Sequence, residues 1–558
     1  MMKKLFLPLL LMVAVSAQAA DKIATPHSDQ GSENPVLTIE GGQVQGVLAD
    51  DHPDVFVYRG IPYAAPPIKE NRWKEPQPIV PWKGVKICDT FGHPSYQAIQ
   101  YPGGYFTEWG YGKEAPYSED CLYLNVWTKA PGQVNKKLPV ALWIHGGGFR
   151  EGWGSEPEFD GQEWGAKDVV LVSINYRLGV FGFLVHPALT AESPHHSSGN
   201  YGILDQIEAL KWIKKNIAQF GGDPNNVTIF GESGGGGKVG SLLCMPPAKG
   251  LFHKAIIMSG TILNVNTKAM TEELGEAVLK ELGIDKKNID KIKDVPYKDL
   301  YAAGQRAMAA SIGTRRPGTP MMWGFGPTPD GEVLLQQPFQ PAFASFSDDI
   351  PLMIGTTFNE LQRSRYGQKI TFEEARKDLQ RTFGDETDAY ISAFMESYPD
   401  KTLERLPQDL LSIDWLFRPK TIITADAIGG KRKADTYVYM YTVGESDNRG
   451  YKGSVHGAEL KYCFDVLHHY SNQLSQSTLD ANQIWATRIS DVWAQFAHTG
   501  NPDSNGQYGW HPYTQENGEL LEFGGTDARI HHNHDRKLEE IINRHCFKQL
   551  DAFRASHP

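Results

Sequence analysis

A serine set among glycines, Ser233, is the strongest candidate for chemistry in this sequence. It lies in GESGG (231–235), a match to the G-x-S-x-G pattern, and directly follows the apolar run 227–230. In a nucleophile elbow, a tight turn from strand to helix strains the serine backbone, and small neighbours leave the hydroxyl exposed at the top of a sheet. The pattern therefore predicts a nucleophilic serine.

Three other interpretations of this glycine run compete with the elbow. A plain flexible turn stays open as long as the serine has no partners elsewhere in the chain. A phosphate-binding P-loop would need glycine in place of Glu232 and Ser or Thr in place of Val239. A serine-lysine acylase would need lysine at position 236, which is glycine. We therefore expect Gly237 and Lys238 to form an ordinary helix start.

A serine hydroxyl needs a base that takes its proton and an acid that orients the base. In α/β-hydrolases the acid, and then the histidine, follow the serine along the chain. His456 fits best, in the small-residue loop GSVHGAE (453–459), and Glu360 follows the predicted strand PLMIG (351–355). Spacing alone leaves four other acids open, namely Asp330, Asp348, Asp349 and Asp414.

The loop HGGGF (145–149) is a candidate oxyanion hole. It directly follows the apolar run 140–144, and its consecutive glycines let backbone N–H groups approach a developing negative oxygen. The N–H of Gly234, directly after the nucleophile, can complete the set of donors. The clustered histidines at 195–196, 468–469 and 531–534 are predicted to be solvated surface residues, and we expect no metal and no cofactor.

Strands that alternate with helices must position these residues. Alternation of this kind predicts an α/β fold, with a mainly parallel sheet covered by helices on both faces. The serine then lies beyond the carboxyl end of a strand, where such sheets bind ligands. Apolar runs predict strands at 140–144, 169–174, 227–230, 255–258, 352–354 and 436–441, and helical spacing predicts helices at 203–220, 272–282 and 484–497.

The net charge and the N-terminal residues indicate which partners and which cellular location to expect. A formal net charge of -11 over 558 residues, without a basic stripe, argues against nucleic acid as a partner. Residues 1–19 predict a secretory signal peptide, because a basic head and an apolar run precede AQA at 17–19. We therefore expect an exported protein, periplasmic or extracellular, with no stable membrane insertion. A polar lead-in at 20–34 separates the signal peptide from the folded chain.

Longer blocks around these residues resemble the type B carboxylesterase/lipase family, the cholinesterase-like branch of the α/β-hydrolases. FGGDPNNVTIFGESGG (220–235) and EDCLYLNVW (119–127) are similar to its two signatures, and NYRLG (175–179) is similar to a further block. The resemblance implies one α/β-hydrolase domain over 35–558, with long insertions that form an active-site gorge. It also implies a small-molecule ester as substrate and leaves the oligomeric state open.

The same resemblance assigns roles to the candidate residues. It makes Ser233 the nucleophile of a serine esterase, His456 its general acid and base, and Glu360 the acid that orients His456. Two other functions stay as alternatives: a non-catalytic cholinesterase-like binding protein, and an amide or carbamate hydrolase on the same triad. The implied oxyanion donors are the N–H groups of Gly147, Gly148 and Gly234.

The resemblance finally implies two pairings. Arg59 and Glu119 would form a structural ion pair. Ser95 stands where the family has the cysteine that pairs with Cys121, and we hypothesise that Cys88 takes its place. The chain between these cysteines carries aromatic residues that either line the mouth of the gorge or pack the loop itself, namely Tyr105, Phe106, Trp109 and Tyr111.

Overall fold

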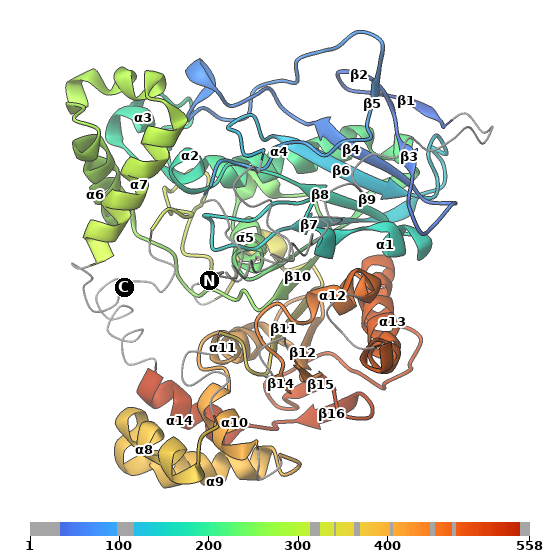
Figure 1. Cartoon of the computed structure of the whole chain (residues 1–558), viewed down its shortest axis with the longest axis vertical. Coiled ribbons are helices and arrows are strands. Elements are labelled where there is room, and N and C mark those ends of the chain that lie inside the picture. The colour runs from blue at the N-terminus through green and yellow to red at the C-terminus, as the bar shows by residue number, and fades with distance from the viewer. Residues whose placement is uncertain are drawn as a thin grey trace, which may run out of the picture. The chain divides into compact units, whose positions relative to one another are not determined.

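In the part of the chain that the computed structural model describes, eleven strands form the central sheet (Figure 1). In sheet order they are β16 (Arg529–His532), β15 (Glu519–Phe523), β12 (Thr436–Tyr441), β11 (Leu352–Thr357), β10 (Lys254–Met258), β9 (Gly222–Glu232), β7 (Leu138–Ile144), β8 (Val170–Ile174), β6 (Tyr123–Thr128), β4 (Phe56–Pro62) and β3 (Val47–Leu48). All neighbours from β15 to β8 pair in parallel. The antiparallel pairs lie at the two edges.

The structure describes residues 34–97, 116–312, 324–339, 342–361, 369–401, 405–446, 452–470 and 476–546. The chain divides into two units, Met1–Asn34 and Pro35–Pro558. The predicted signal peptide (1–19) and the aromatic residues at 105–111 lie outside the described residues, and both stay predictions.

Strand β7 shows why helices cover both faces of the sheet. Val140, Leu142 and Ile144 belong to one buried cluster with residues of α4 (Tyr201–Asn216). Ala141 and Trp143 belong to a second cluster with residues of α13 (Gln476–Thr499). A strand buried on both faces needs apolar side chains throughout, which is the pattern that predicted it. The α/β architecture with a mainly parallel sheet is confirmed.

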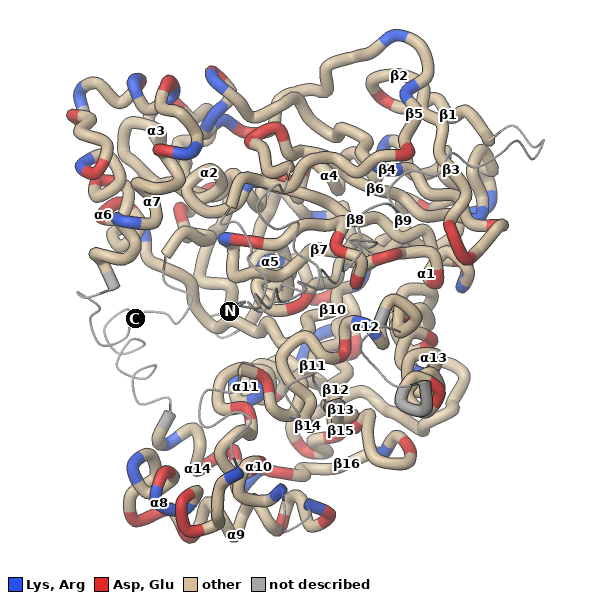
Figure 2. Tube along the Cα trace, viewed as in Figure 1, with Lys and Arg blue, Asp and Glu red and all other residues tan. Residues whose placement is uncertain are grey.

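The remaining helices lie between successive strands along the chain or after the last strand (Figure 1). Residues of both charge signs mix along outer helices such as α6 and α8 (Figure 2). The helices are α1 (Gln162–Ala166), α2 (Gly179–Phe183), α3 (Pro187–Glu192), α5 (Gly234–Leu242), α6 (Lys268–Glu281), α7 (Tyr297–Ile312), α8 (Phe372–Phe383), α9 (Thr387–Ser397), α10 (Leu406–Ser412), α11 (Arg418–Ile428), α12 (Leu460–Cys463) and α14 (Arg536–Cys546).

Small sheets accompany the large one. β1 (Val36–Ile39) pairs with β2 (Gly42–Gln45) in an antiparallel hairpin, and β5 (Val85–Ile87) adds a parallel third strand. Gly41 turns the hairpin with a φ of 98°, a conformation that glycine adopts without a Cβ clash. Two short strands, β13 (Glu445–Ser446) and β14 (Lys452–Gly453), form a separate antiparallel pair.

The helix predicted over 203–220 changes type near its end. α4 stops at Asn216, and a 3-10 helix (Ile217–Phe220) continues to Gly221, which has a φ of 77°. A left-handed residue ends a helix, and glycine is the residue that adopts this conformation most readily. The chain then enters β9, which begins at Gly222 and not at the predicted residue 227.

The implied ion pair between Arg59 and Glu119 is wrong. Arg72, and not Arg59, pairs with Glu119: its Nε and Nη2 donate to the two carboxylate oxygens of Glu119 at 2.7 and 2.6 Å. Both side chains are 8% exposed, and a bidentate pair of this kind is the strongest geometry for arginine and carboxylate. Arg59 instead lies over the ring of Phe91, with 5.2 Å between the guanidinium carbon and the ring centroid.

The hypothesised disulfide between Cys88 and Cys121 is also wrong, because both thiols are free and buried. The Cys88 thiol donates to the carbonyl of Lys86 over 3.7 Å, and the Cys121 thiol contacts the Ser95 hydroxyl. Burial raises the pKa of Cys88 to about 12, so its reactive thiolate is disfavoured. Ser95, which stands where the family has a cysteine, therefore contacts the Cys121 thiol but cannot form a disulfide with it.

Candidate active site

Ser233 lies at the turn between β9 and α5, with a φ of 56° and a ψ of -123°. This is a strained backbone for a residue with a side chain, as the elbow pattern predicts. Its N–H donates to the carbonyl of Met258 on the neighbouring strand at 2.9 Å. The flanking glycines are required by space, because a Cβ on Gly235 would lie 2.0 Å from the carbonyl oxygen of Ile144. The close approach of strand, turn and helix thus depends on the glycines of the motif.

The predicted oxyanion loop lies directly against the elbow. Gly147 and Gly148 have φ values of 84° and 60°, and a Cβ on Gly147 would lie 2.0 Å from the carbonyl oxygen of Glu151. A Cβ on Gly234 would lie 2.6 Å from the nitrogen of Gly148. Two of the predicted donors, the N–H groups of Gly148 and Gly234, are therefore carried by backbone segments in direct contact. The third, Gly147, precedes Gly148 in the same loop.

The loops that carry Glu360 and His456 are joined through their backbones. The N–H of His456 donates to the carbonyl of Glu360 at 3.2 Å, and the N–H of Asn359 donates to the carbonyl of Ser454 at 2.9 Å. Glu360 has a φ of 40°, and its N–H donates to the hydroxyl of Thr357 at 3.2 Å. Residues about 95 positions apart in the chain are thereby held side by side.

The side chains of Glu360 and His456 form a hydrogen bond between Oε2 and Nδ1. The second carboxylate oxygen of Glu360 accepts the N–H of Thr357 at 2.8 Å, which fixes the carboxylate. The ring of Phe417 stacks on His456, with centroids 5.0 Å apart and planes within 5°. The imidazole is therefore held on one edge by an acid and on one face by an aromatic ring.

The other ring nitrogen of His456, Nε2, lies 3.1 Å from Oε1 of Glu232, the residue before the predicted nucleophile. Burial lowers the pKa of His456, but the charges of Glu232 and Glu360 outweigh it and raise the pKa to about 10. Burial raises the pKa of Glu232 to about 8, although the charge of His456 opposes this shift. The imidazole and the elbow are thus electrostatically coupled.

Two more buried acids face this group. Burial and the charges of Glu232 and Glu360 raise the pKa of Glu459 well above its ordinary value, and Glu459 accepts a hydrogen bond from Ser259 at 3.4 Å. Burial and the charge of Glu360 raise the pKa of Asp414 to about 7, although backbone N–H groups oppose the shift. The charges of Glu232, Glu360 and Glu459 together favour the protonated form of His456.

The other acids that spacing left open have structural contacts. Asp414 accepts backbone N–H groups at the start of α11, the nearest at 2.6 Å. Asp330 accepts the N–H groups of a turn, among them that of Val333 at 2.8 Å. Asp348 and Asp349 lie 3.8 and 3.2 Å from the cationic groups of Arg432 and Lys433.

Sequence reasoning missed two residues near the site. Glu232 occupies a variable position of the motif, and nothing in its spacing predicted a contact with His456. Lys238, which we expected in an ordinary helix start, is fully buried, and its Nζ donates to the carbonyl of His145 at 3.2 Å. The one signal in the sequence was the position of Lys238 among glycines and a valine, with no polar residue beside it.

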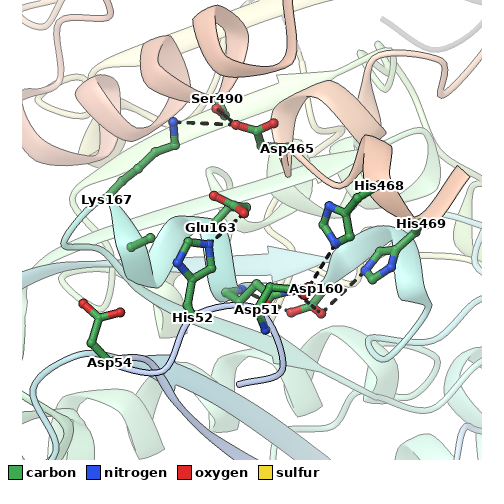
Figure 3. A network of polar contacts seen from close by, with 12 residues as sticks. Asp51, His52, Asp54, Asp160, Glu163, Lys167, Asp465, His468, His469 and Ser490 are labelled. Carbon is green, nitrogen blue, oxygen red and sulfur yellow. Dashed lines mark hydrogen bonds and ion pairs between the residues drawn. The ribbon is translucent and has the colours of Figure 1, made fainter. Parts of the chain in front are cut away.

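The clustered histidines at 468–469 are partly exposed and contact carboxylates in a polar network that we call the edge region (Figure 3). Among the described residues, no three His, Cys, Asp or Glu side chains gather in a way that could hold a metal ion. In the view of Figure 3 the 3-10 helix Leu467–Tyr470 lies opposite α1 and the loop after β3. The contacts are His52 to Glu163 at 2.8 Å, His468 to Asp51 at 3.4 Å and His469 to Asp160 at 3.7 Å.

Known proteins match this chain over most of its length. The profile of the carboxylesterase family matches residues 33–540. Fumonisin B1 esterase from Sphingopyxis macrogoltabida is 34% identical over 521 residues, which cover 92% of this chain and 88% of that protein. Para-nitrobenzyl esterase from Bacillus subtilis (strain 168) is 34% identical over 493 residues, which cover 87% of this chain and 94% of that protein.

Solved structures show the same fold. A para-nitrobenzyl esterase has a TM-score of 0.72 and 31% identity, with 92% of this chain and 99% of that chain covered. An esterase from Clostridium hathewayi that can hydrolyse aliphatic aromatic polyesters has a TM-score of 0.77 and 29% identity, with 92% and 98% covered. The α/β-hydrolase fold is thereby confirmed. Within the described residues, no helix combines the length and the apolar character needed to cross a membrane.

Proposed function

Because this chain belongs to the carboxylesterase family and is a carboxylic-ester hydrolase, we propose that it cleaves small-molecule esters through an acyl-enzyme on Ser233. The observation that carries this proposal is the combination of a strained serine elbow with a buried imidazole bound to a carboxylate. A serine becomes a nucleophile when a base takes its proton, and an oriented base does so best.

In the first half of the reaction, the hydroxyl oxygen of Ser233 attacks the ester carbonyl carbon, and Nε2 of His456 takes the hydroxyl proton. Glu360 accepts the hydrogen bond from Nδ1, which selects the required tautomer and stabilises the imidazolium. The carbonyl oxygen becomes an oxyanion, which the N–H groups of Gly147, Gly148 and Gly234 stabilise. When the intermediate collapses, the imidazolium gives its proton to the leaving alcohol.

In the second half, His456 takes a proton from water, and the hydroxide formed attacks the acyl carbon of the ester on Ser233. The same N–H groups stabilise the second oxyanion, and collapse returns the proton to the oxygen of Ser233. The products are a carboxylic acid and the free enzyme. This sequence needs no group beyond the residues named and water.

The test replaces Ser233 by alanine, which keeps the glycine-flanked turn and removes the attacking oxygen. We expect S233A to hydrolyse short p-nitrophenyl esters at less than about a thousandth of the wild-type rate, because loss of a triad member typically costs more than that. Ser241 lies on the same helix, α5, with its hydroxyl bound to the carbonyl of Gly237 at 2.9 Å. The variant S241A is therefore the matched control, expected to keep its activity.

A fluorophosphonate probe tests the same proposal without a substrate. We expect the probe to label the wild-type protein and S241A on Ser233, and to leave S233A unlabelled. Appreciable turnover by a folded S233A, or labelling at another serine, would overturn the assignment.

A further inference from the structure

Lys238 is a buried lysine that the proposed mechanism does not use. It lies in α5 with no exposed surface, and among the described residues it forms no ion pair. Burying an ammonium group without a carboxylate is costly, so such residues are rare and concentrate at functional sites. Burial lowers the pKa of Lys238 well below its ordinary value, and the charge of Glu232 opposes this shift only in part.

The Lys238 amine nevertheless has partners within the buried site. Nζ donates to the carbonyl of His145 at 3.2 Å, and it lies 4.9 Å from the ring centroids of Phe149 and of Tyr176. A carbonyl and two aromatic faces thus enclose the amine, an arrangement that favours a cation. All three contacts belong to the oxyanion loop or to its immediate support.

The glycine run explains how a lysine reaches this place. A Cβ on Gly235 would lie 2.8 Å from the carbonyl oxygen of His145, and a Cβ on Gly237 would lie 3.3 Å from the ring of Phe149. The first four residues of α5 are glycines, so the helix packs directly on the loop backbone. Lys238 is the first residue of α5 with a side chain, and helix side chains lean toward the N-terminus, which directs it back over the loop.

The carbonyl that Lys238 binds lies at the start of the oxyanion loop. The same oxygen accepts the hydroxyl of Tyr176 at 2.7 Å, and the Tyr176 ring stacks on His145 with 4.3 Å between centroids. The next residues, Gly146 to Gly148, are glycines with wide conformational freedom. Without a fixed start, such a segment would not hold its N–H groups in one place.

We propose that Lys238 is a positioning residue, which fixes the oxyanion loop through the carbonyl of His145 and thereby holds the N–H groups of Gly147 and Gly148 on the oxyanion. This role rests on the proposed function, since it presupposes that these N–H groups face the oxyanion formed by Ser233. Lys238 contacts neither substrate nor Ser233 in this role. It connects α5, the helix that follows Ser233, to the loop whose N–H groups bind the oxyanion.

A positioning role in the oxyanion hole has a specific kinetic signature. The oxyanion exists only in the intermediates and the transition states, so a displaced donor lowers kcat and leaves KM nearly unchanged. A trifluoromethyl ketone, which adds to the serine and forms a stable oxyanion, must lose affinity by the same factor as kcat. A purely structural loss of folded protein would lower the active fraction without changing this inhibition constant.

The test variant is K238M, which keeps the length and apolar stem of the side chain and removes its donors. We expect kcat for p-nitrophenyl acetate to fall about tenfold or more, since loss of one oxyanion donor costs ~10²–10³ and here donors are displaced, not removed. The inhibition constant of a trifluoromethyl ketone should rise by the same factor. The matched control is K254M, because Lys254 on β10 is also buried but lies beside Asn226.

A double-mutant cycle with Y176F tests the shared carbonyl. Lys238 and Tyr176 donate to the same oxygen, so we expect the double variant to lose more in kcat than the two single variants predict. K238Q, with a shorter neutral donor, should recover part of the lost kcat, and it replaces K238M if that variant does not fold. Wild-type kcat and inhibition in K238M, or in K238Q if only that variant folds, would overturn the proposal. If S233A is inactive while the Lys238 variant behaves like wild type, the proposed function stands and only the role of Lys238 is overturned.

Discussion

Histidines contact carboxylates in two regions of this protein, and the two regions give the imidazole opposite properties. Around His456, the imidazole and its partners Glu232 and Glu360 are almost fully buried. At the edge region of Figure 3, the rings of His468 and His469 are 41% and 27% exposed. Both regions contain pairs at hydrogen-bond or ion-pair distance, so pairing alone does not distinguish them.

The pKa values of the imidazoles distinguish the two regions. The pKa of His456 is raised to about 10, because the charges of Glu232 and Glu360 outweigh the effect of burial. The pKa of His468 is lowered, because burial and the neighbouring His469 outweigh the effect of three nearby acids, Asp51, Asp160 and Glu163. These three acids are partly exposed, and Gln162 donates to two of them, Asp51 and Asp160. Acids that are buried together with the imidazole, not the mere presence of acids nearby, therefore give His456 its affinity for a proton.

The largest effect is expected when the carboxylate of Glu360 is neutralised. In E360Q the amide keeps the size of the side chain, but it neither selects the tautomer reliably nor stabilises the imidazolium. We expect kcat for a p-nitrophenyl ester to fall roughly 10³- to 10⁴-fold, as in related triads that lose their acid.

The matched control for E360Q is D160N, which neutralises the acid that faces His469 at 3.7 Å. The edge pair is half-exposed and screened, so we expect wild-type kcat from D160N. The contrast between the regions fails if the two variants lose activity to a similar extent.

A smaller and more specific effect is expected from Glu232. Only neutral His456 accepts the serine proton, so kcat/KM rises with pH through the pKa of His456. The charge of Glu232 raises that pKa, and E232Q removes it. We expect the rise of kcat/KM in E232Q to occur at a pH lower by about one unit or more. The measurement is the pH profile of kcat/KM for wild type and variant.

The control for E232Q is again D160N, which should leave the pH profile in place. A profile that moves to higher pH in E232Q, or does not move, would show that Glu232 does not act on His456 through its charge. The charges of the buried acids would then not explain the difference between the two regions.

The parts of the site that sequence predicts are those set by local sterics. The elbow needs glycines within two positions of Ser233, and a buried strand needs an unbroken apolar run, so both are visible in a few residues. Glu360 is different: spacing left it among five acids, and only the family resemblance selected it. Its contact with His456 depends on the register of two loops that lie 96 positions apart in the chain.

The errors have the same origin. Arg59 and Arg72 are both near the N-terminal strands, and nothing local shows that Arg72 reaches Glu119, 47 positions away. The burial of Lys238 likewise depends on a loop 93 positions earlier in the chain. Pairings of polar groups across tertiary contacts are set by the packed chain, and the sequence pattern alone does not carry them.

The smallest effect is expected at the edge region, as a change in acid stability. The pKa of His468 is lowered in the folded protein, so the unfolded chain binds the proton more readily. Stability is then present above the ordinary histidine pKa of about 6.5 and is lost as the pH falls below it. H468Q removes this loss.

We therefore expect the melting temperature of wild type to fall more steeply between about pH 6.5 and 5 than that of H468Q, by about 1–2 °C over this range, since the ring is 41% exposed and its charge is screened. A thermal melt followed by circular dichroism across this range measures the difference. The control is H532Q, because the side chain of His532 is 60% exposed and should leave the slope unchanged. The opposite result, a wild type that gains stability on acidification relative to H468Q, would mean that the nearby acids raise the pKa of His468. The contrast with His456 would then disappear.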